Sequence, residues 1–404
     1  MSTVTEPRSG AKTARERIDS IDILRGVVMA IMILDHVRDY FHRDAQLFSP
    51  EDLAHTNGWL FLTRWMTHFC APVFIFLAGV SVHFSSQRRT SLPLMTRFLI
   101  SRGVWIIALD WTLVNIGESF NFAYSFVLLQ VLWATGWCMI ALASLIWLPR
   151  SVVAGIALGM IALHNAFDWV KPEAWGRFGW AWSILHVPTF MHAGGHTLIF
   201  LYPLIPWIGV MAAGYCFGPV MQMEARRRRQ ALARLGAGLT ALFFLLRLSN
   251  VYGDPRTWGV QASGTLTAIS FFNVNKYPPS LLYLLMTLGP ALLLLAIIDQ
   301  VRIKEHNVFR VFGRVPMFYY LIHWYVLHAL AIVLGGLRYG RWDFYFTMPL
   351  PVLGLPAPGF PQDYGYNLAI VYLIWLGLVS SLYLPCRWYM DFKNRSHAWW
   401  LSYL

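Results

Sequence analysis

Residues 17–36 read Arg17-Ile-Asp-Ser-Ile-Asp-Ile-Leu-Arg-Gly-Val-Val-Met-Ala-Ile-Met-Ile-Leu-Asp-His36, which is typical of a membrane helix. The run nevertheless carries ionisable groups, and a charge in hydrocarbon costs about 3 kcal/mol, so such groups normally face a protein interior or a wet cavity. At helical spacing, one stripe collects the residues Asp22, Arg25, Met29, Met32, His36 and Asp39. His36 then lies about 16 Å above Arg25, roughly half a bilayer. We therefore expect an anion-binding arginine at one end of this helix and a proton acceptor farther along it.

The composition indicates a membrane protein. The chain has 404 residues, of which 57% are hydrophobic and 13% charged, about half the charge of a soluble domain. Long apolar runs occur along the whole chain and predict an all-α, polytopic transmembrane helix bundle. The net charge of +12 comes largely from short basic segments between these runs, so we expect membrane lipid and no nucleic acid as a partner.

Ten spans are predicted, at 19–40, 58–82, 98–116, 126–148, 151–165, 196–217, 233–250, 278–300, 314–335 and 366–388. With the N-terminus inside, 21 Lys and Arg residues fall on the inner side and 10 on the outer side. This asymmetry predicts both termini in the cytoplasm and a multi-pass protein of the cell inner membrane. We expect a cytoplasmic tail at 1–18, one transmembrane domain at 19–390 and a second cytoplasmic tail at 391–404. The long outer loops are expected to cover a cavity.

The first candidate for chemistry is the pair Asp35-His36. A histidine base needs a carboxylate to set its tautomer and pKa. Asp35 points about 100° away from His36 on a helix, whereas Asp39, three residues on, is better placed to contact the imidazole. The alternative is that these are ordinary polar residues at a helix end.

Three further groups combine polar residues with apolar spans. Arg64 and His68 are four residues apart and share a helix face, where Arg64 can bind a carboxylate or a hydroxyl-rich substrate. Arg314 stands at a helix N-terminus that favours phosphate, and His323 lies farther along the same span. Asn275 and Lys276 precede the eighth span and can orient a sugar. For each group, a snorkelling cation or a hydrogen-bonded core histidine is the alternative.

Metal and disulfide sites are not expected. The four cysteines lie in or beside apolar segments, and no pair falls in a predicted outer loop. Of the loop histidines, only His192 and His196 have helical spacing, and no carboxylate accompanies them.

The motifs resemble a known family. The stretch Ile21-Asp-Ile-Leu-Arg-Gly26, with a polar residue ten positions after the glycine, resembles the catalytic domain of heparan-alpha-glucosaminide N-acetyltransferase and its bacterial relatives. The Phe-Ile-Phe-Leu-Ala-Gly79 run, Asn275-Lys276 before Ser280-Leu, and the Gly-Tyr-His spacing from Gly313 to His323 are similar too. The Asp-x-x-Arg-Gly…His pattern also resembles the wider superfamily of membrane sugar acyltransferases, in which a first-helix histidine acts as base.

The resemblance implies transfer of an acetyl group from cytosolic acetyl-CoA to a sugar or glycan acceptor on the far side of the membrane. The lysosomal enzyme has asparagine at the position of His36, and its catalytic histidine lies in the first outer loop. That loop is longer in this chain, so His55 aligns with the catalytic histidine only if an insertion is allowed. The base is therefore His36, His55 or His68, and the stripe favours His36. Three questions stay open at this point: the identity of the acceptor, whether the acetyl group passes directly or through an acyl-histidine intermediate, and whether the protein forms a homodimer.

We therefore predict a membrane acetyltransferase with acetyl-CoA as donor and no metal. The arginines expected to receive the CoA phosphates are Arg25, Arg97, Arg102 and Arg314, with the pantetheine arm along Met29 and Met32. The residues expected around the reacting groups are His36, Asp35, Asp39, His68 and His323, with His55, Arg64, Asn275 and Lys276 on the acceptor. The main alternative is a secondary transporter or flippase that uses the buried charges as a proton relay. A non-catalytic assembly subunit is the third possibility.

Overall fold

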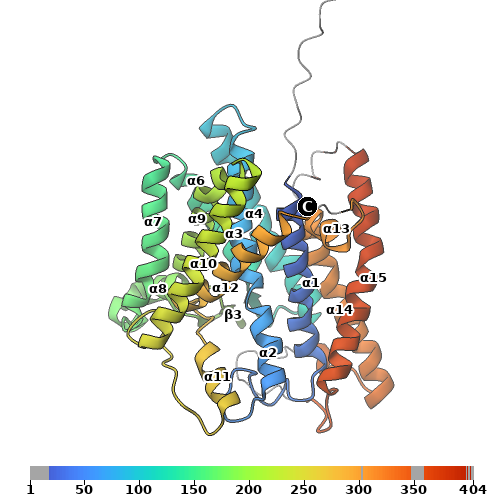
Figure 1. Ribbon diagram of the computed structural model, residues 1–404. Coiled ribbons are helices and arrows are strands. Elements are labelled where there is room, and N and C mark those ends of the chain that lie inside the picture. The colour runs from blue at the N-terminus through green and yellow to red at the C-terminus, as the bar shows by residue number, and fades with distance from the viewer. Residues whose placement is uncertain (1–17, 302–303, 347–358, 397, 399–400, 402–404) are drawn as a thin grey trace, which may run out of the picture.

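Helices dominate the computed structural model, which describes residues 18–301, 304–346, 359–396, 398 and 401 (Figure 1). Among these residues, eight helical segments are long and apolar enough to cross a membrane: Gly58–Ser86, Leu92–Ser119, Arg150–Phe167, Leu204–Met221, Ala225–Ser249, Leu281–Ile298, Pro316–Tyr339 and Leu368–Arg395. All eight overlap predicted spans. The two other predicted spans contain α1 (Asp19–Phe41), which carries more charges than such a helix usually does, and α6 (Val131–Leu145), which is shorter. The fold is thus the expected all-α polytopic membrane bundle.

The long helices are, in chain order, α1, α3 (Cys70–Ser86), α4 (Leu92–Leu109), α6, α7 (Arg150–Leu163), α9 (Leu204–Met221), α10 (Ala225–Ser249), α12 (Leu281–Ile298), α14 (Pro316–Tyr339) and α15 (Leu368–Arg395). The shorter elements are α2 (Gly58–Thr67), the π-helix η1 (Asp110–Val114), α5 (Asn115–Ser119), η2 (His164–Phe167), η3 (Pro172–Phe178), α8 (Gly179–His186), α11 (Gly264–Phe272), α13 (Val308–Arg314) and η4 (Asp343–Phe346). The predicted N-terminal tail lies almost entirely outside the described residues, and α15 continues five residues into the predicted C-terminal tail.

Helix α1 runs through the bundle and packs on α13, α14, α15, α3, α2 and α12. Two glycines allow its closest crossing, which is with α13. A Cβ atom at Gly26 would collide with the carbonyl of Phe309, and one at Gly313 would collide with the carbonyl of Asp22. Small residues at helix crossings serve this purpose in membranes, where backbones must approach closely to gain packing energy.

The predicted second span is divided into two helices. Helix α2 ends at Thr67 and α3 begins at Cys70, so the segment Gly58–Ser86 that covers the predicted span at 58–82 contains a break. Pro72 explains the break, because proline has no N–H to donate to the carbonyl four residues earlier, which is that of His68. The hydroxyl of Tyr283 donates to that carbonyl instead, at 2.8 Å. The Tyr283 side chain thereby connects α12 to the break between α2 and α3.

A small sheet replaces the start of two predicted spans. Strand β1 (Phe126–Leu129) pairs in parallel with β3 (His196–Phe200), which pairs in antiparallel with β2 (Thr189–Ala193). The predicted helices at 126–148 and 196–217 therefore begin too early. Short apolar runs fit a strand or a helix equally well, and here the pairing partners come from distant parts of the chain. At 225, by contrast, α10 begins before its predicted start and includes the Arg226–Arg229 run.

Candidate active site

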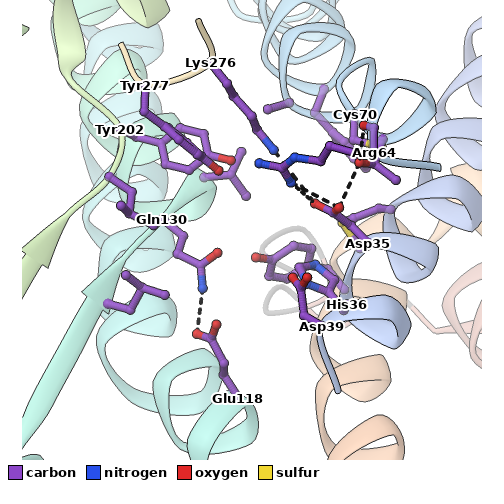
Figure 2. Close-up of a pocket in the computed structure, with 18 residues that line it drawn as sticks. Asp35, His36, Asp39, Arg64, Cys70, Glu118, Gln130, Tyr202, Lys276 and Tyr277 are labelled. Carbon is purple, nitrogen blue, oxygen red and sulfur yellow. Dashed lines mark hydrogen bonds and ion pairs between the residues drawn. The ribbon is translucent and has the colours of Figure 1, made fainter. Parts of the chain in front are cut away.

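A polar cavity lies beside the second half of α1 (Figure 2). Its empty volume is about 790 Å³, which includes the opening to solvent. Its walls come from α1, α2, α3, α5, β1, α6, the segment before α9, the turn before α12, and α14: Met32, Asp35, His36, Asp39, Arg64, Thr67, Cys70, Ala71, Phe74, Glu118, Leu128, Gln130, Val131, Leu201, Tyr202, Lys276, Tyr277 and Tyr320. Segments far apart in the sequence thus supply one polar site inside the bundle.

Asp35 is the centre of the charge network on one wall. Arg64 Nη1 lies 2.8 Å and 3.1 Å from its two carboxylate oxygens, and Arg38 Nη1 lies 2.7 Å from Oδ1. The Thr67 hydroxyl donates to Oδ1 at 2.9 Å, and Lys276 Nζ lies 3.8 Å from Oδ2. Figure 2 shows Arg64 and Lys276 converging on this carboxylate. One carboxylate therefore orients three cations, and the network carries a positive excess.

Glu51, in the loop between α1 and α2, extends this network. Its carboxylate is 2.9 Å from Arg64 Nε, 3.3 Å from His68 Nε2 and 3.1 Å from Arg256 Nη1. Burial opposes ionisation of Glu51, but Arg64, the His68 hydrogen bond and Arg256 outweigh it and hold the pKa of Glu51 well below its usual value. The expected shared face of Arg64 and His68 is confirmed, since both contact this carboxylate. Sequence spacing did not reveal Glu51, because a loop residue has no periodicity.

His36 lines the cavity without the expected contact to Asp39. The Asp39 carboxylate is bound by Arg38 Nη2 at 2.6 Å, and the structure records no His36–Asp39 hydrogen bond among the residues it describes. The neighbouring guanidinium is the stronger partner for that carboxylate, so this expectation is wrong. The His36 ring packs on Trp324, with ring centroids 4.1 Å apart, and its centroid lies 5.4 Å from that of His323.

His323 lies behind His36 and not in the cavity wall. Its Nδ1 is 2.5 Å from the carbonyl oxygen of Tyr320, which fixes a proton on Nδ1 because a carbonyl only accepts. Its Nε2 is buried and has no hydrogen-bond partner among the described residues. Trp324 and Tyr320 flank the ring. His323, a residue of α14, therefore packs behind the His36 ring.

The opposite wall carries Glu118, which the sequence analysis missed. Gln130 Nε2 donates to its carboxylate at 2.6 Å, as Figure 2 shows. The Tyr40 hydroxyl and, at 2.9 Å, His328 Nδ1 contact the Glu118 backbone carbonyl. The π-helix η1 lies just before α5, and π-helical turns are frequent at functional sites. The π-helical turn changes the helical phase of the apolar span that precedes Glu118. Regular helical spacing therefore could not predict that Glu118 faces the cavity.

The arginines expected to receive CoA separate into two groups. Arg25 contacts Asp22, the Gly313 carbonyl and Ser81, and Arg314 contacts the same aspartate at 3.9 Å. Arg25 and Arg314 therefore meet at Asp22. Arg97 instead lines a hollow with Pro93 and Trp147, and its helix α4, which also carries Arg102, packs mainly on α6.

The expected passage along α1 is closed between the arginine cluster and the cavity. The described cavity reaches Met32 but neither Met29 nor Arg25, and Met29 is fully buried. The stripe therefore carries two polar sites, with the apolar residues 26–34 of α1 between them. The expected course of the pantetheine arm along Met29 and Met32 is therefore not open at Met29 in this conformation.

Two residues expected on the acceptor lie elsewhere. His55 is exposed and its Nδ1 is 2.7 Å from Asp52 in the α1–α2 loop. Asn275 shapes the turn before α12: its side chain donates to the Pro278 carbonyl at 3.0 Å, and its backbone N–H donates to Asp254 at 2.8 Å. Asn275 thereby positions Lys276 at the cavity.

His192 and His196 lie on strands β2 and β3 and not on a helix. His192 Nδ1 is 3.1 Å from the Thr197 hydroxyl, and His196 Nδ1 is 2.6 Å from the Tyr124 carbonyl. Throughout the part of the chain that the structure describes, no group of three His, Cys, Asp or Glu residues is arranged to hold a metal ion.

A comparison with known protein families agrees with the motifs in the first part of the chain, Ile21–Gly26 and the run that ends at Gly79. The family model described as heparan-alpha-glucosaminide N-acetyltransferase, catalytic, matches residues 17–249, which include α1, the Arg64–His68 segment and Glu118. A comparison with curated proteins gives no match. The family match covers more than half of the chain and contains most of the cavity walls. The protein therefore belongs to the heparan-alpha-glucosaminide N-acetyltransferase catalytic family, and it is a membrane acetyltransferase.

Proposed function

We propose that the protein transfers the acetyl group of cytosolic acetyl-CoA to a sugar or amino-sugar acceptor that enters the cavity from the extracytoplasmic side, with His36 as general base. The observation that carries this proposal is the position of His36 in the wall of a polar cavity in a member of an acetyltransferase family. Asp35 and Arg64 hold the surrounding charges in place, and three tyrosines supply faces on which a sugar ring can pack.

In the proposed reaction, the acceptor hydroxyl or amine attacks the thioester carbonyl while His36 removes its proton. Collapse of the tetrahedral intermediate breaks the carbon–sulfur bond, and the CoA thiolate leaves and takes up the proton from His36. Lys276, whose ammonium lines the same cavity 3.8 Å from Asp35, is assigned the stabilisation of the oxyanion. General base catalysis contributes a factor of about 100–10,000.

The donor is proposed to bind at the opposite end of α1. Arg25 and Arg314 both contact Asp22 at that end, and charge-assisted hydrogen bonds to phosphate suit guanidinium groups. For the acetyl group to reach His36, the side chains of Met29 and Met32 must change rotamer. Methionine, with its three rotatable side-chain bonds, can do this with little steric cost. Arg97 and Arg102 have no part in this proposal.

A transfer assay tests the proposal. Purified protein in lipid nanodiscs is incubated with [acetyl-¹⁴C]acetyl-CoA and glucosamine, and labelled N-acetylglucosamine is counted. His36→Ala is expected to lower kcat at least 100-fold. The matched control is His55→Ala, which removes an exposed histidine of the nearby loop and is expected to keep full activity. Absence of transfer by the wild-type protein, or equal loss in both variants, would overturn the proposal and favour a transporter.

A further inference from the structure

Two further hollows share lining residues with the cavity or with each other. The first, the vestibule, is lined by residues of the end of α1 and of the α1–α2 loop, and it shares Asp39 and Arg64 with the cavity. The second, the outer groove, lies between the first turns of α2 and α15 and shares His42, Asp44 and Leu60 with the vestibule. The vestibule therefore has lining residues in common with the cavity on one side and with the outer groove on the other.

The apolar share of the lining is highest in the outer groove. The vestibule presents charged and polar groups such as Arg38, Asp39 and Ser49. The outer groove presents the apolar side chains of Trp59, Leu60, Leu368 and Ala369 beside the polar residues that it shares with the loop after α1. The charge network therefore lies next to His36, and the outer groove adds apolar side chains at the rim.

The outer groove lies where two membrane-length segments begin. Gly58–Ser86 and Leu368–Arg395 both start at its edge. Trp59 is 74% exposed there, as expected for a tryptophan at the boundary between lipid and water. The hydroxyls of Thr63 and Tyr372, 2.9 Å apart, join the two helices at the groove. The apolar side chains of the groove therefore lie where two candidate membrane spans begin.

We propose that the acceptor is a sugar carried by a membrane lipid, with its head group in the cavity and its hydrocarbon chain leaving through the vestibule and the outer groove. The inference rests on the proposed function for the location of the reacting sugar. A water-soluble sugar gains nothing from the apolar side chains at the rim, whereas an amphiphile can place its head group among the charges of the cavity and its chain against Trp59, Leu60 and Leu368. Each methylene of the chain that is buried there adds hydrophobic binding energy.

The test compares two acceptors with the same head group, methyl glucosaminide and octyl glucosaminide, in nanodiscs with labelled acetyl-CoA. The wild-type protein is expected to show a kcat/KM at least tenfold higher for the octyl glycoside. Because the octyl chain also concentrates that acceptor in the bilayer, the decisive quantity is the change of this ratio in variants. Ala369→Trp, which fills the outer groove, and Trp59→Ala are expected to lower the ratio at least fivefold.

Trp388→Ala is the matched control, since Trp388 is an exposed tryptophan of α15 away from the outer groove. It is expected to keep the wild-type ratio. Equal ratios in wild type, Ala369→Trp and Trp388→Ala would overturn the inference while leaving the proposed transfer intact.

Binding separates the two proposals when no transfer occurs. Radiolabelled octyl glucosaminide is bound to nanodiscs without acetyl-CoA, and specific binding is defined by displacement with excess methyl glucosaminide. Specific binding that is lost in Ala369→Trp supports the lipid-linked ligand even if the proposed transfer fails. Equal specific binding by wild type and Ala369→Trp, or none by either, contradicts it.

Discussion

At the scale of single residues, buried charges are tolerated here because each has several partners. Asp35 touches two guanidinium groups, a hydroxyl and an ammonium group. Burying a charge is costly, and removing one member of such a network leaves the others uncompensated. The network is therefore a weak source of net stability but a strong constraint on which substitutions the site accepts.

Asp35→Asn is expected to destabilise the protein by about 3–5 kcal/mol, because it leaves Arg38, Arg64 and Lys276 without their shared carboxylate. The measurement is thermal unfolding in detergent, followed by tryptophan fluorescence. Asp52→Asn, which breaks the exposed pair with His55, is the control and is expected to cost about 1 kcal/mol or less. Similar melting temperatures for the two variants would contradict this account of the network.

The charge on Glu51 makes the stability of the folded protein depend on pH. Its pKa in the folded protein is held below the ordinary value of 4.5, so ionised Glu51 stabilises the fold above that pH. The contribution is lost as the pH falls from 4.5 through the depressed pKa. Wild type should therefore melt higher than Glu51→Gln at pH 7, and the two curves should converge at the acid end of a pH series. A constant gap would show that Glu51 acts through packing and not through its charge.

At the scale of elements, helix crossings depend on single glycines. Gly26→Ala places a methyl group against the Phe309 carbonyl and is expected to lower the melting temperature and the transfer activity together. Gly377→Ala on α15 is the control, because nothing lies within 4 Å of a Cβ atom there and alanine favours helix by up to about 1 kcal/mol. Equal stability of both variants would mean that α1 and α13 do not cross as described.

The break between α2 and α3 permits a rescue experiment. Tyr283→Phe leaves the His68 carbonyl without its hydrogen bond and is expected to cost about 1–3 kcal/mol. Adding Pro72→Ala supplies an N–H four residues after that carbonyl, so the double variant should melt higher than Tyr283→Phe alone. If Pro72→Ala is as harmful in that background as in the wild type, the proline does not cause the break.

At the scale of the whole molecule, the sequence was sufficient for the bundle but not for the cavity. Apolar runs of about 20 residues predict spans whatever they pack against, and the ionisable residues of α1 indicated an interior-facing polar side. Arg64 and Lys276 were found because their positions stand out beside apolar runs. Glu51, Glu118 and Gln130 were not found, because a loop, a π-helix and a strand end place them, and these depend on pairing with distant segments. For the same reason, the helical stripe did not indicate that neighbouring segments bury Met29 completely.

The central claim is that one site joins a donor on one side of the membrane to an acceptor on the other. Proteoliposomes with glucosamine trapped inside and [acetyl-¹⁴C]acetyl-CoA added outside test it most directly, since neither compound crosses the bilayer unaided. We expect labelled N-acetylglucosamine in the lumen with wild-type protein and at least 100-fold less with His36→Ala. Transfer that requires both compounds on the same side would contradict the claim.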